Sequence, residues 1–199
     1  MVKVKICGLT RTRDIEAVNA EMPDFIGFVF ARSKREVTPD AAAALRDALH
    51  PSITPVGVFV DGRPEIIHSL TRSGVIEMIQ LHGSEDERYI REIKDLTGLP
   101  VIKAVAVETR GDAQKWESSS ADYLLLDHKG GGTGRRFDWD LIGSVGRPFF
   151  LAGGINPQNA GEAIGKTSPF AIDTSSGVET DGFKDHAKIK ELIERVRHG

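Results

Sequence analysis

Short apolar runs recur along the chain and indicate buried strands. Each run is too short for a typical helix and is rich in β-branched or aromatic residues. The runs begin roughly 20–30 residues apart, which is close to the length of one strand–helix unit. The pattern therefore predicts eight strands, at residues 2–7, 25–30, 55–60, 76–81, 101–107, 123–126, 149–152 and 170–172.

Segments with helical spacing lie between several of these runs. The first is rich in Ala and Leu, and Thr38 is a suitable N-cap because Pro39 follows it. In the last segment, Ile189, Leu192 and Val196 fall on one stripe of a helix. The spacing predicts helices over residues 40–49, 65–70, 85–96, 157–164 and 184–196.

Strands that alternate with helices along the whole chain favour a parallel sheet in an α/β fold. Eight such units favour closure into a single (βα)8 barrel, the TIM barrel, over residues 1–199. The chain is at the short end for this fold, so its loops should be short. The alternative is an open α/β sheet with two miscounted strands. Against it, Cys7-Gly8-Leu9-Thr10 after the first run lacks the dinucleotide-binding glycine pattern.

Composition places the chain among ordinary globular proteins, with 40% hydrophobic and 28% charged residues. A formal net charge of −3 gives no electrostatic reason to expect nucleic acid or a membrane as a partner. No apolar run approaches the roughly 18–20 residues of a membrane span. Charged and apolar residues alternate at the N-terminus, unlike a signal peptide, and the single cysteine excludes an internal disulfide. A cytoplasmic protein is expected.

Polar residues follow several of the apolar runs, and the active site of a (βα)8 barrel lies at the carboxyl ends of its strands. Cys7 ends the first run, His82 follows the fourth, Asp127 the sixth and Asp173 the eighth. Because the helix-covered outer face of a strand should be apolar, alternation in the first run assigns Cys7 to the barrel interior. These four side chains are therefore candidates for one site.

Each candidate also has a structural interpretation. A lone buried cysteine often serves as a small hydrophobic residue, an aspartate can cap a turn, and a histidine can be satisfied within the core. Arg32, Lys34 and Arg35 after the second run can form a solvated loop. No pair among the six histidines has the spacing of a zinc site, and there is no second cysteine, so no metal is expected.

Two turns suggest a phosphate site. Gly153 and Gly154 follow the seventh run and precede a helix for which Asn156 is the expected N-cap, whereas Ser175 and Ser176 follow the eighth run. Exposed backbone N–H groups and a helix N-terminus favour an anion, and loops after strands seven and eight recurrently bind phosphate in this fold. The alternative is that the glycines only form tight turns. The expected partner is a small phosphorylated molecule.

Segments with a distinctive sequence occur from one end of the chain to the other. They are Lys5-Ile6-Cys7-Gly8-Leu9-Thr10, Gly27-Phe28-Val29-Phe30 with Ser33-Lys34-Arg35, Gly57-Val58-Phe59-Val60, Gln80-Leu81-His82-Gly83, Gly131-Gly132-Thr133-Gly134 leading to Phe137-Asp138-Trp139, Leu151-Ala152-Gly153-Gly154-Ile155-Asn156-Pro157 and Asp173-Thr174-Ser175-Ser176-Gly177-Val178-Glu179. In this order they resemble the phosphoribosylanthranilate isomerase family. The short, glycine-dense loop after Asp127 departs from the family pattern.

The resemblance implies an Amadori rearrangement in tryptophan biosynthesis. N-(5'-phosphoribosyl)anthranilate, an aminoaldose, becomes 1-(2-carboxyphenylamino)-1-deoxyribulose 5-phosphate by general acid–base catalysis. Asp127 would protonate the furanose oxygen, so burial should raise its pKa from about 3.9. Cys7 would remove the proton from C2, so cations such as Lys5 should lower its pKa from about 8.5. The iminium nitrogen takes up the electrons, so no cofactor is expected.

The resemblance also implies roles for the remaining candidates. Arg35 would bind the anthranilate carboxylate, Asp173 a substrate hydroxyl or amine, and His82 the rim of the substrate. The backbone at Gly153, Gly154, Ser175 and Ser176 would bind phosphate, and the protein would be a monomer or a homodimer. Two other interpretations stay open. One is another phosphosugar barrel, such as an epimerase or the histidine-pathway isomerase, which would use paired aspartates, and the other is a barrel that binds a phosphorylated metabolite without turnover.

Overall fold

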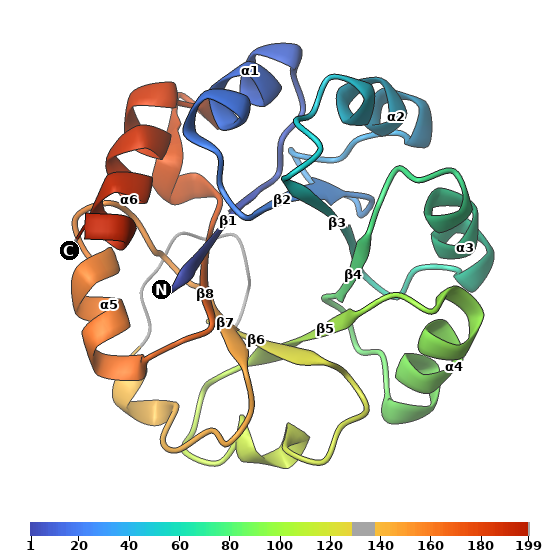
Figure 1. Ribbon diagram of the computed structural model, residues 1–199. Helices are drawn as coiled ribbons and strands as arrows, with labels where there is room; N and C mark the ends of the chain where they lie inside the picture. The colour runs from blue at the N-terminus through green and yellow to red at the C-terminus, as the bar shows by residue number, and fades with distance from the viewer. Residues whose placement is uncertain (129–137, 199) are drawn as a thin grey trace.

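The computed structural model of the protein describes residues 1–128 and 138–198. Eight parallel strands pair in chain order, and the first also pairs with the eighth, which closes a barrel (Figure 1). The closed barrel confirms the predicted fold and excludes the open sheet. The strands are β1 (Lys3–Cys7), β2 (Phe25–Val29), β3 (Thr54–Phe59), β4 (Met78–Leu81), β5 (Val101–Ala106), β6 (Tyr123–Asp127), β7 (Phe149–Leu151) and β8 (Ala171–Thr174).

Helices surround the barrel on its outside (Figure 1). Five of them agree with the predicted segments to within a few residues, and the Thr38 hydroxyl accepts the Ala41 N–H at 3.2 Å, which confirms that N-cap. The α-helices of the described residues are α1 (Thr12–Glu21), α2 (Pro39–Asp47), α3 (Pro64–Arg72), α4 (Glu87–Thr97), α5 (Ala160–Thr167) and α6 (His186–His198).

Helix α1 was missed by the sequence analysis. Its apolar stripe is short, with Ile15, Ala17 and Val18 as the buried hydrophobic residues. The helix start is fixed instead by Asp14, whose carboxylate accepts the backbone N–H groups of Thr10 and Arg11 at 2.9 and 3.0 Å. A capping carboxylate of this kind gives no hydrophobic periodicity, so the apolar pattern alone could not show the helix.

The prediction that a helix follows every strand is wrong in the described part of the chain. Only a short 3-10 helix, η1 (Gln114–Trp116), lies between β5 and β6, and another, η2 (Trp139–Leu141), precedes β7. In the segment after β5, the Asp112 carboxylate forms a local turn. It accepts the backbone N–H groups of Glu108 and Thr109 at 3.0 and 2.7 Å. Such local side-chain bonds compete with helix formation. The glycine-dense loop after Asp127 falls at residues 129–137, outside the described residues.

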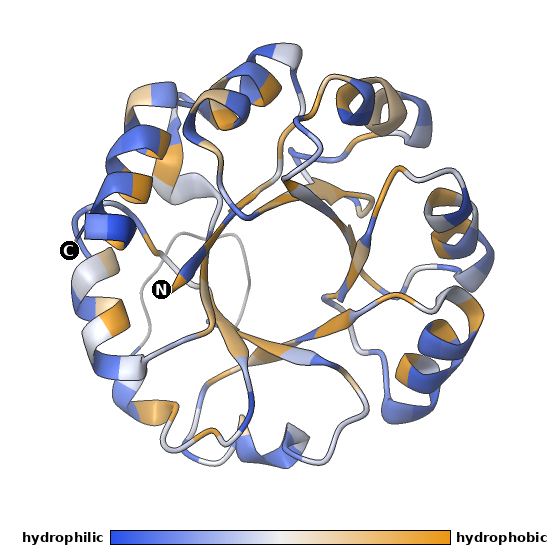
Figure 2. Cartoon of the chain, viewed as in Figure 1, coloured by the Kyte–Doolittle hydropathy of each residue, from blue (hydrophilic) through white to orange (hydrophobic). Residues whose placement is uncertain are grey.

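Buried apolar residues form two clusters, one between barrel and helices and one inside the barrel. Figure 2 shows the hydrophobic residues that recur along the strands and on parts of the helices. Val4 and Ile6 of β1 belong to the outer cluster. Lys5 between them is fully buried, and its ammonium lies 2.9 Å from Asp173 Oδ1 of the neighbouring strand β8. Strand alternation therefore places Cys7 on the inner face with Lys5, as predicted.

An aromatic cluster fills the barrel interior at the amino-terminal ends of the strands. It consists of Phe25, Tyr123, Phe150 and Phe170, with ring centroids 4.9–6.4 Å apart. The Lys3 ammonium lies 5.3 Å from the Phe25 ring and 5.4 Å from the Phe170 ring, within the range of cation–π attraction. Bulky side chains thus occupy this end, and smaller or polar ones occupy the opposite end.

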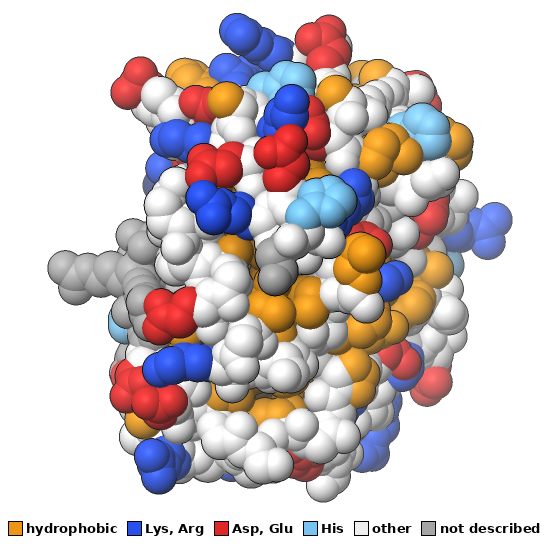
Figure 3. Space-filling view, turned by 60° about the vertical axis from the view of Figure 1, so that its left-hand side comes forward, with side chains coloured by type: hydrophobic (Ala, Val, Ile, Leu, Met, Phe, Trp, Pro, Cys, Tyr) orange, Lys and Arg blue, Asp and Glu red, His pale blue; other side chains and the backbone are white. Residues whose placement is uncertain are grey.

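Charged side chains of both signs are mixed on the face shown in Figure 3, where Lys and Arg lie beside Asp and Glu. One pair on the surface joins His186 Nε2 and Glu21 Oε1 at 2.8 Å. The mixture agrees with the small net charge of −3. Within residues 1–128 and 138–198, no helix has both the length and the apolar character that a membrane crossing requires.

Candidate active site

The carboxyl ends of the strands bring the predicted polar residues to one end of the barrel. Cys7 ends β1, Asp127 ends β6 and Asp173 lies in β8, and each of the three is 8% exposed. His82 follows β4 and is half-buried. Segments up to 168 positions apart in the sequence therefore converge here, because parallel strands all end on the same rim.

Asp127 carries the clearest electrostatic perturbation of the site. Burial raises its pKa from 3.8 to about 6, although the backbone N–H of His128, at 2.7 Å from Oδ1, acts in the opposite direction. The nearby carboxylate of Asp173 adds to the increase. A carboxyl group in this state can hold a proton far closer to neutrality than an exposed aspartate can.

His82 lies between Asp127 and Gln80. Its Nε2 is 3.7 Å from Asp127 Oδ2, and its Nδ1 is 2.8 Å from Gln80 Nε2. Burial lowers the pKa of His82, so the ring is neutral near pH 7. The histidine thus faces the candidate acid with one nitrogen and a buried amide with the other.

Cys7 lies near two buried cations, Lys5 and Lys184. Burial raises the pKa of the Cys7 thiol, while the charges of Lys5 and Lys184 act to lower it. The prediction that cations lower this pKa is therefore wrong for the net direction, because burial outweighs them. The neighbouring Asp173 also raises the Cys7 pKa and holds the Lys5 ammonium in a buried ion pair.

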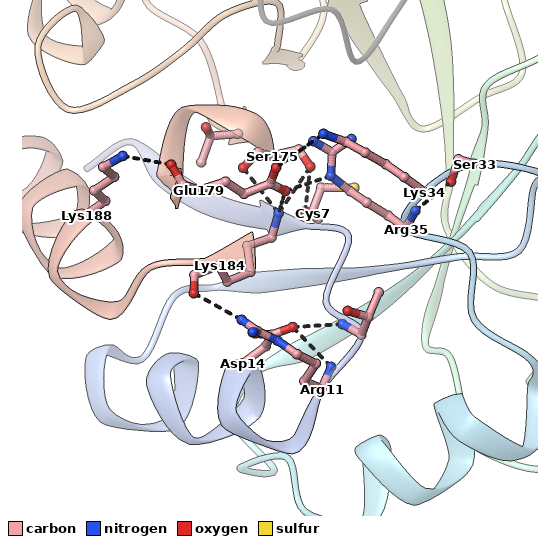
Figure 4. Close-up of polar contacts among 12 residues, drawn as sticks. Cys7, Arg11, Asp14, Ser33, Lys34, Arg35, Ser175, Glu179, Lys184 and Lys188 are labelled. Atoms are coloured by element: carbon pink, nitrogen blue, oxygen red, sulfur yellow. Dashed lines mark hydrogen bonds and ion pairs between the residues drawn. The ribbon is translucent and has the colours of Figure 1, made fainter. Parts of the chain in front are cut away.

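Arg35 is held by Glu179 in a two-point ion pair. The Arg35 Nε and Nη2 atoms lie 2.7 and 2.8 Å from the two carboxylate oxygens of Glu179. Lys184 Nζ lies 2.5 Å from the same carboxylate, and both basic groups converge on it in Figure 4. Burial raises the pKa of Glu179, but the hydrogen bonds from Arg35 and Lys184 outweigh burial and keep it below its usual value.

Ser175 joins this ion-pair network to Cys7. Its hydroxyl donates to the backbone carbonyl of Cys7 at 2.8 Å, and Lys184 Nζ lies 3.2 Å from both the hydroxyl and the carbonyl of Ser175 (Figure 4). Gly8 has a φ of +81°, and a Cβ there would meet the Arg35 side chain at 2.4 Å. Glycine is therefore required after Cys7 for Arg35 to reach Glu179.

The two predicted phosphate turns lie side by side. Gly153 and Gly154 have φ values of +82° and +71°, and Gly154 lines a cavity of about 330 Å³ together with Ser176 and Gly177. The Ile155 carbonyl accepts the Thr174 hydroxyl at 2.6 Å, which ties the two turns together. Gly154 of the first turn and Ser176 of the second therefore line one concave surface, which Gly153 and Ser175 do not line.

The prediction that Asn156 is the N-cap of helix α5 is wrong, because the helix begins about one turn later. Helix α5 begins at Ala160, and Asn159 is its N-cap. Asn156 instead starts the preceding turn, where its Oδ1 accepts the N–H groups of Gln158 and Asn159 at 2.9 and 3.1 Å. An asparagine satisfies its own turn in this way as readily as a helix end, so sequence alone did not separate the two.

Lys184 and the pairing partner of Arg35 were not found from the sequence. Lys184 lies in a two-stranded hairpin, β9 (Glu179–Thr180) and β10 (Phe183–Lys184), whose register sets it opposite Glu179. The Asp181-Gly182 dipeptide between these strands is a hairpin signal that could have revealed the contact. Among the described residues, no group of three or more His, Cys, Asp or Glu side chains is placed to hold a metal ion.

A closed parallel barrel with a proton-holding carboxyl group, a thiol and a glycine-lined turn pair on its carboxyl-terminal rim defines the class of (βα)8 barrel enzymes. The family model described as N-(5'phosphoribosyl)anthranilate (PRA) isomerase matches residues 4–195. The chain belongs to this family.

Individual relatives match over nearly their full length. N-(5'-phosphoribosyl)anthranilate isomerase of Endomicrobium trichonymphae is 44% identical over 201 residues, covering 99% of each chain. Monomers generated from the dimeric isomerase of Thermotoga maritima have a TM-score of 0.88 and 38% identity, with 99% of each chain covered. A phosphoribosyl anthranilate isomerase in complex with reduced 1-(o-carboxyphenylamino)-1-deoxyribulose 5-phosphate has a TM-score of 0.85 and 36% identity, also over 99% of each chain.

Proposed function

We propose that this chain converts N-(5'-phosphoribosyl)anthranilate to 1-(2-carboxyphenylamino)-1-deoxyribulose 5-phosphate, the isomerisation step of tryptophan biosynthesis, with Asp127 as general acid and Cys7 as general base. Family membership supports the reaction. The observation that carries the assignment of the acid is the buried Asp127, whose pKa is raised to about 6. Such a group can donate a proton near neutral pH.

Ring opening is the first step. Asp127 gives its proton to the furanose ring oxygen, the bond from that oxygen to C1 breaks, and the nitrogen lone pair forms a C1=N iminium. The enzyme is left with a buried carboxylate next to a substrate cation. His82 Nε2 lies 3.7 Å from Oδ2 of that carboxylate.

Proton removal from C2 is the second step. Cys7 as thiolate takes the C2 proton, and the electron pair moves to the iminium nitrogen, giving an enolamine that tautomerises to the ketone. Lys5 and Lys184 favour the thiolate, and the iminium adds a further positive charge once the ring has opened. The nitrogen of the substrate is the electron sink, so this sequence of steps uses no cofactor.

The two ends of the substrate require different partners. Glu179 occupies the Nε and Nη2 edge of Arg35, so we assign the edge formed by Nη1 and Nη2 to the anthranilate carboxylate. The backbone of Gly153, Gly154, Ser175 and Ser176 is assigned to the phosphate. The relative solved with a carboxyphenylamino deoxyribulose phosphate supports this division, because that ligand has a carboxylate at one end and a phosphate at the other.

Asp173 and His82 complete the proposal. Asp173 accepts Lys5 at 2.9 Å through Oδ1, which leaves Oδ2 for a substrate hydroxyl or amine. We expect a cytoplasmic enzyme that works as a monomer or a homodimer, and the dimeric isomerase of Thermotoga maritima supports the second state. Light scattering of the purified protein distinguishes these two states.

The test of the proposed function is direct. Purified protein is mixed with fluorescent N-(5'-phosphoribosyl)anthranilate, and the decay of fluorescence is compared with the spontaneous decay of the substrate. Decay that accelerates in proportion to protein concentration supports the proposal. A protein that binds the substrate, with no acceleration in the native form, would instead be a metabolite-binding barrel.

A further inference from the structure

Gln80 is a buried amide that the proposed reaction does not use. It lies in β4, is 1% exposed, and shares the inner face of the strand with Met78 and His82. Its Nε2 atom lies 2.8 Å from His82 Nδ1, and its Oε1 atom is buried without a hydrogen-bond partner among the described residues. The only polar group that this side chain satisfies there is thus the histidine.

The contact decides which nitrogen of His82 carries the proton. A neutral imidazole has one N–H donor and one acceptor nitrogen, and an amide N–H that donates to Nδ1 requires the proton to be on Nε2. Nε2 faces Asp127 Oδ2 at 3.7 Å. The opposite tautomer would turn the Nε2 lone pair toward the carboxylate oxygen, which is repulsive when Asp127 is ionised.

We infer that Gln80 is a positioning residue that keeps the proton of His82 on Nε2, directed at Asp127. Building on the proposed function, this donor stabilises the Asp127 carboxylate that remains after the ring oxygen has been protonated. Burial lowers the pKa of His82, so the ring stays neutral near pH 7 and the tautomer alone selects the donor nitrogen.

The unsatisfied Oε1 of Gln80 argues against a role in stability. A buried acceptor without a partner lowers stability, so removing it offsets the loss of the hydrogen bond to His82 Nδ1 when an apolar side chain of similar shape takes its place. Gln80→Met keeps the length of the side chain and removes the amide. The variant should therefore unfold at the same urea concentration as the native protein, or at a higher one.

The tautomer is measured by ¹⁵N nuclear magnetic resonance of protein labelled at histidine, with the His82 signals identified through His82→Asn. In the native protein, Nε2 should carry the proton and Nδ1 should not. Gln80→Met should give a mixture of both tautomers. Gln80→Glu presents an acceptor to Nδ1 and should move the proton there.

Activity is measured on the same variants. Both should lose about tenfold or more in kcat with little change in KM, comparable to the loss of other groups that orient a functional side chain. Gln114→Met is the matched control, since the Gln114 amide donates to the carbonyls of Ile142 and Ser144 at 3.0 and 2.8 Å, away from the site. It should be less stable than the native protein but unchanged in the His82 tautomer and in kcat.

Two results would overturn the inference. One is native His82 with its proton on Nδ1, and the other is Gln80→Met with an unchanged tautomer and unchanged kcat. The resonance measurement needs no substrate, so it separates this inference from the proposed function. A native protein without isomerase activity but with the Nε2–H tautomer would contradict only the proposed function.

Discussion

Asp127→Asn is expected to make the protein more resistant to unfolding at alkaline pH while it removes activity. The buried carboxylate is costly to ionise, as its pKa of about 6 against the ordinary 3.8 shows. An amide of the same size carries no such cost and can still accept the N–H of His128 through Oδ1. Its expected loss of turnover is about 10²–10⁴-fold, since it cannot protonate the ring oxygen.

The size of the gain depends on pH. The difference between 3.8 and about 6 corresponds to about 3 kcal/mol, and little of it is screened because the side chain is 11% exposed. Above pH 6 the carboxylate is ionised in both folded and unfolded chains, so the whole cost falls on the folded state. As the pH falls through about 6 toward 4, the folded state takes up a proton that the unfolded state does not, and the cost disappears.

Urea titrations of native protein and variant measure this difference, with the midpoint followed by fluorescence of the two tryptophans. We expect Asp127→Asn to be more stable by about 2–3 kcal/mol near pH 8 and by almost nothing near pH 4. Asp47→Asn, at an exposed position on α2, should change stability by less than about 0.5 kcal/mol at both pH values. An equal gain at both pH values, or none near pH 8, would refute the reasoning.

Three further variants test the other parts of the site. Cys7→Ser should lower kcat by about 10²–10⁴-fold with KM almost unchanged, and near-native turnover would remove Cys7 from the mechanism. Arg35→Ala should raise KM far more than it lowers kcat, whereas the neighbouring Lys34→Ala should change neither. A substrate without the carboxylate should be used equally poorly by native protein and Arg35→Ala; continued discrimination by the variant contradicts the assignment. Gly154→Asp should lose substrate affinity and inhibition by inorganic phosphate together, because it adds strain at a φ of +71° and a like charge. Gly165→Asp on α5, where an added Cβ meets open space, should keep both. Normal phosphate binding by Gly154→Asp would move the anion site elsewhere.

The strands were predictable because most of them are short apolar runs whose residues are buried on both faces. This is the pattern that a parallel barrel under helices requires, so the hydrophobic spacing sufficed. The apolar pattern did not predict helix α1, because the start of this helix depends on the carboxylate of Asp14. The segment after β5 carries no helix because Asp112 bonds to its backbone locally. Specific side-chain contacts of this kind leave no periodic signal.

The position of the candidate residues on one rim was predictable for a different reason. Every parallel strand of a barrel ends on the same rim, so a residue that ends a strand, such as Cys7 or Asp127, is near the others whatever the loops do. The partners of these residues depend on tertiary contacts. Glu179 forms an ion pair with Arg35, and burial raises the pKa of Cys7. Both depend on how the rim residues pack in three dimensions, and the order of residues along the chain gives no signal of that packing.

The barrel is filled at one end by the aromatic rings of Phe25, Tyr123, Phe150 and Phe170 and is open only at the other end. The four aromatic side chains occupy the amino-terminal end, so a small molecule enters and leaves across the carboxyl-terminal rim. Substrate and product must then use the same opening, and on the proposed assignment of Arg35 and the glycine turns a departing product blocks this opening until it has left them. Because both molecules use the same opening, the product should inhibit competitively with the substrate. Product release then becomes a step that limits turnover alongside the chemical steps.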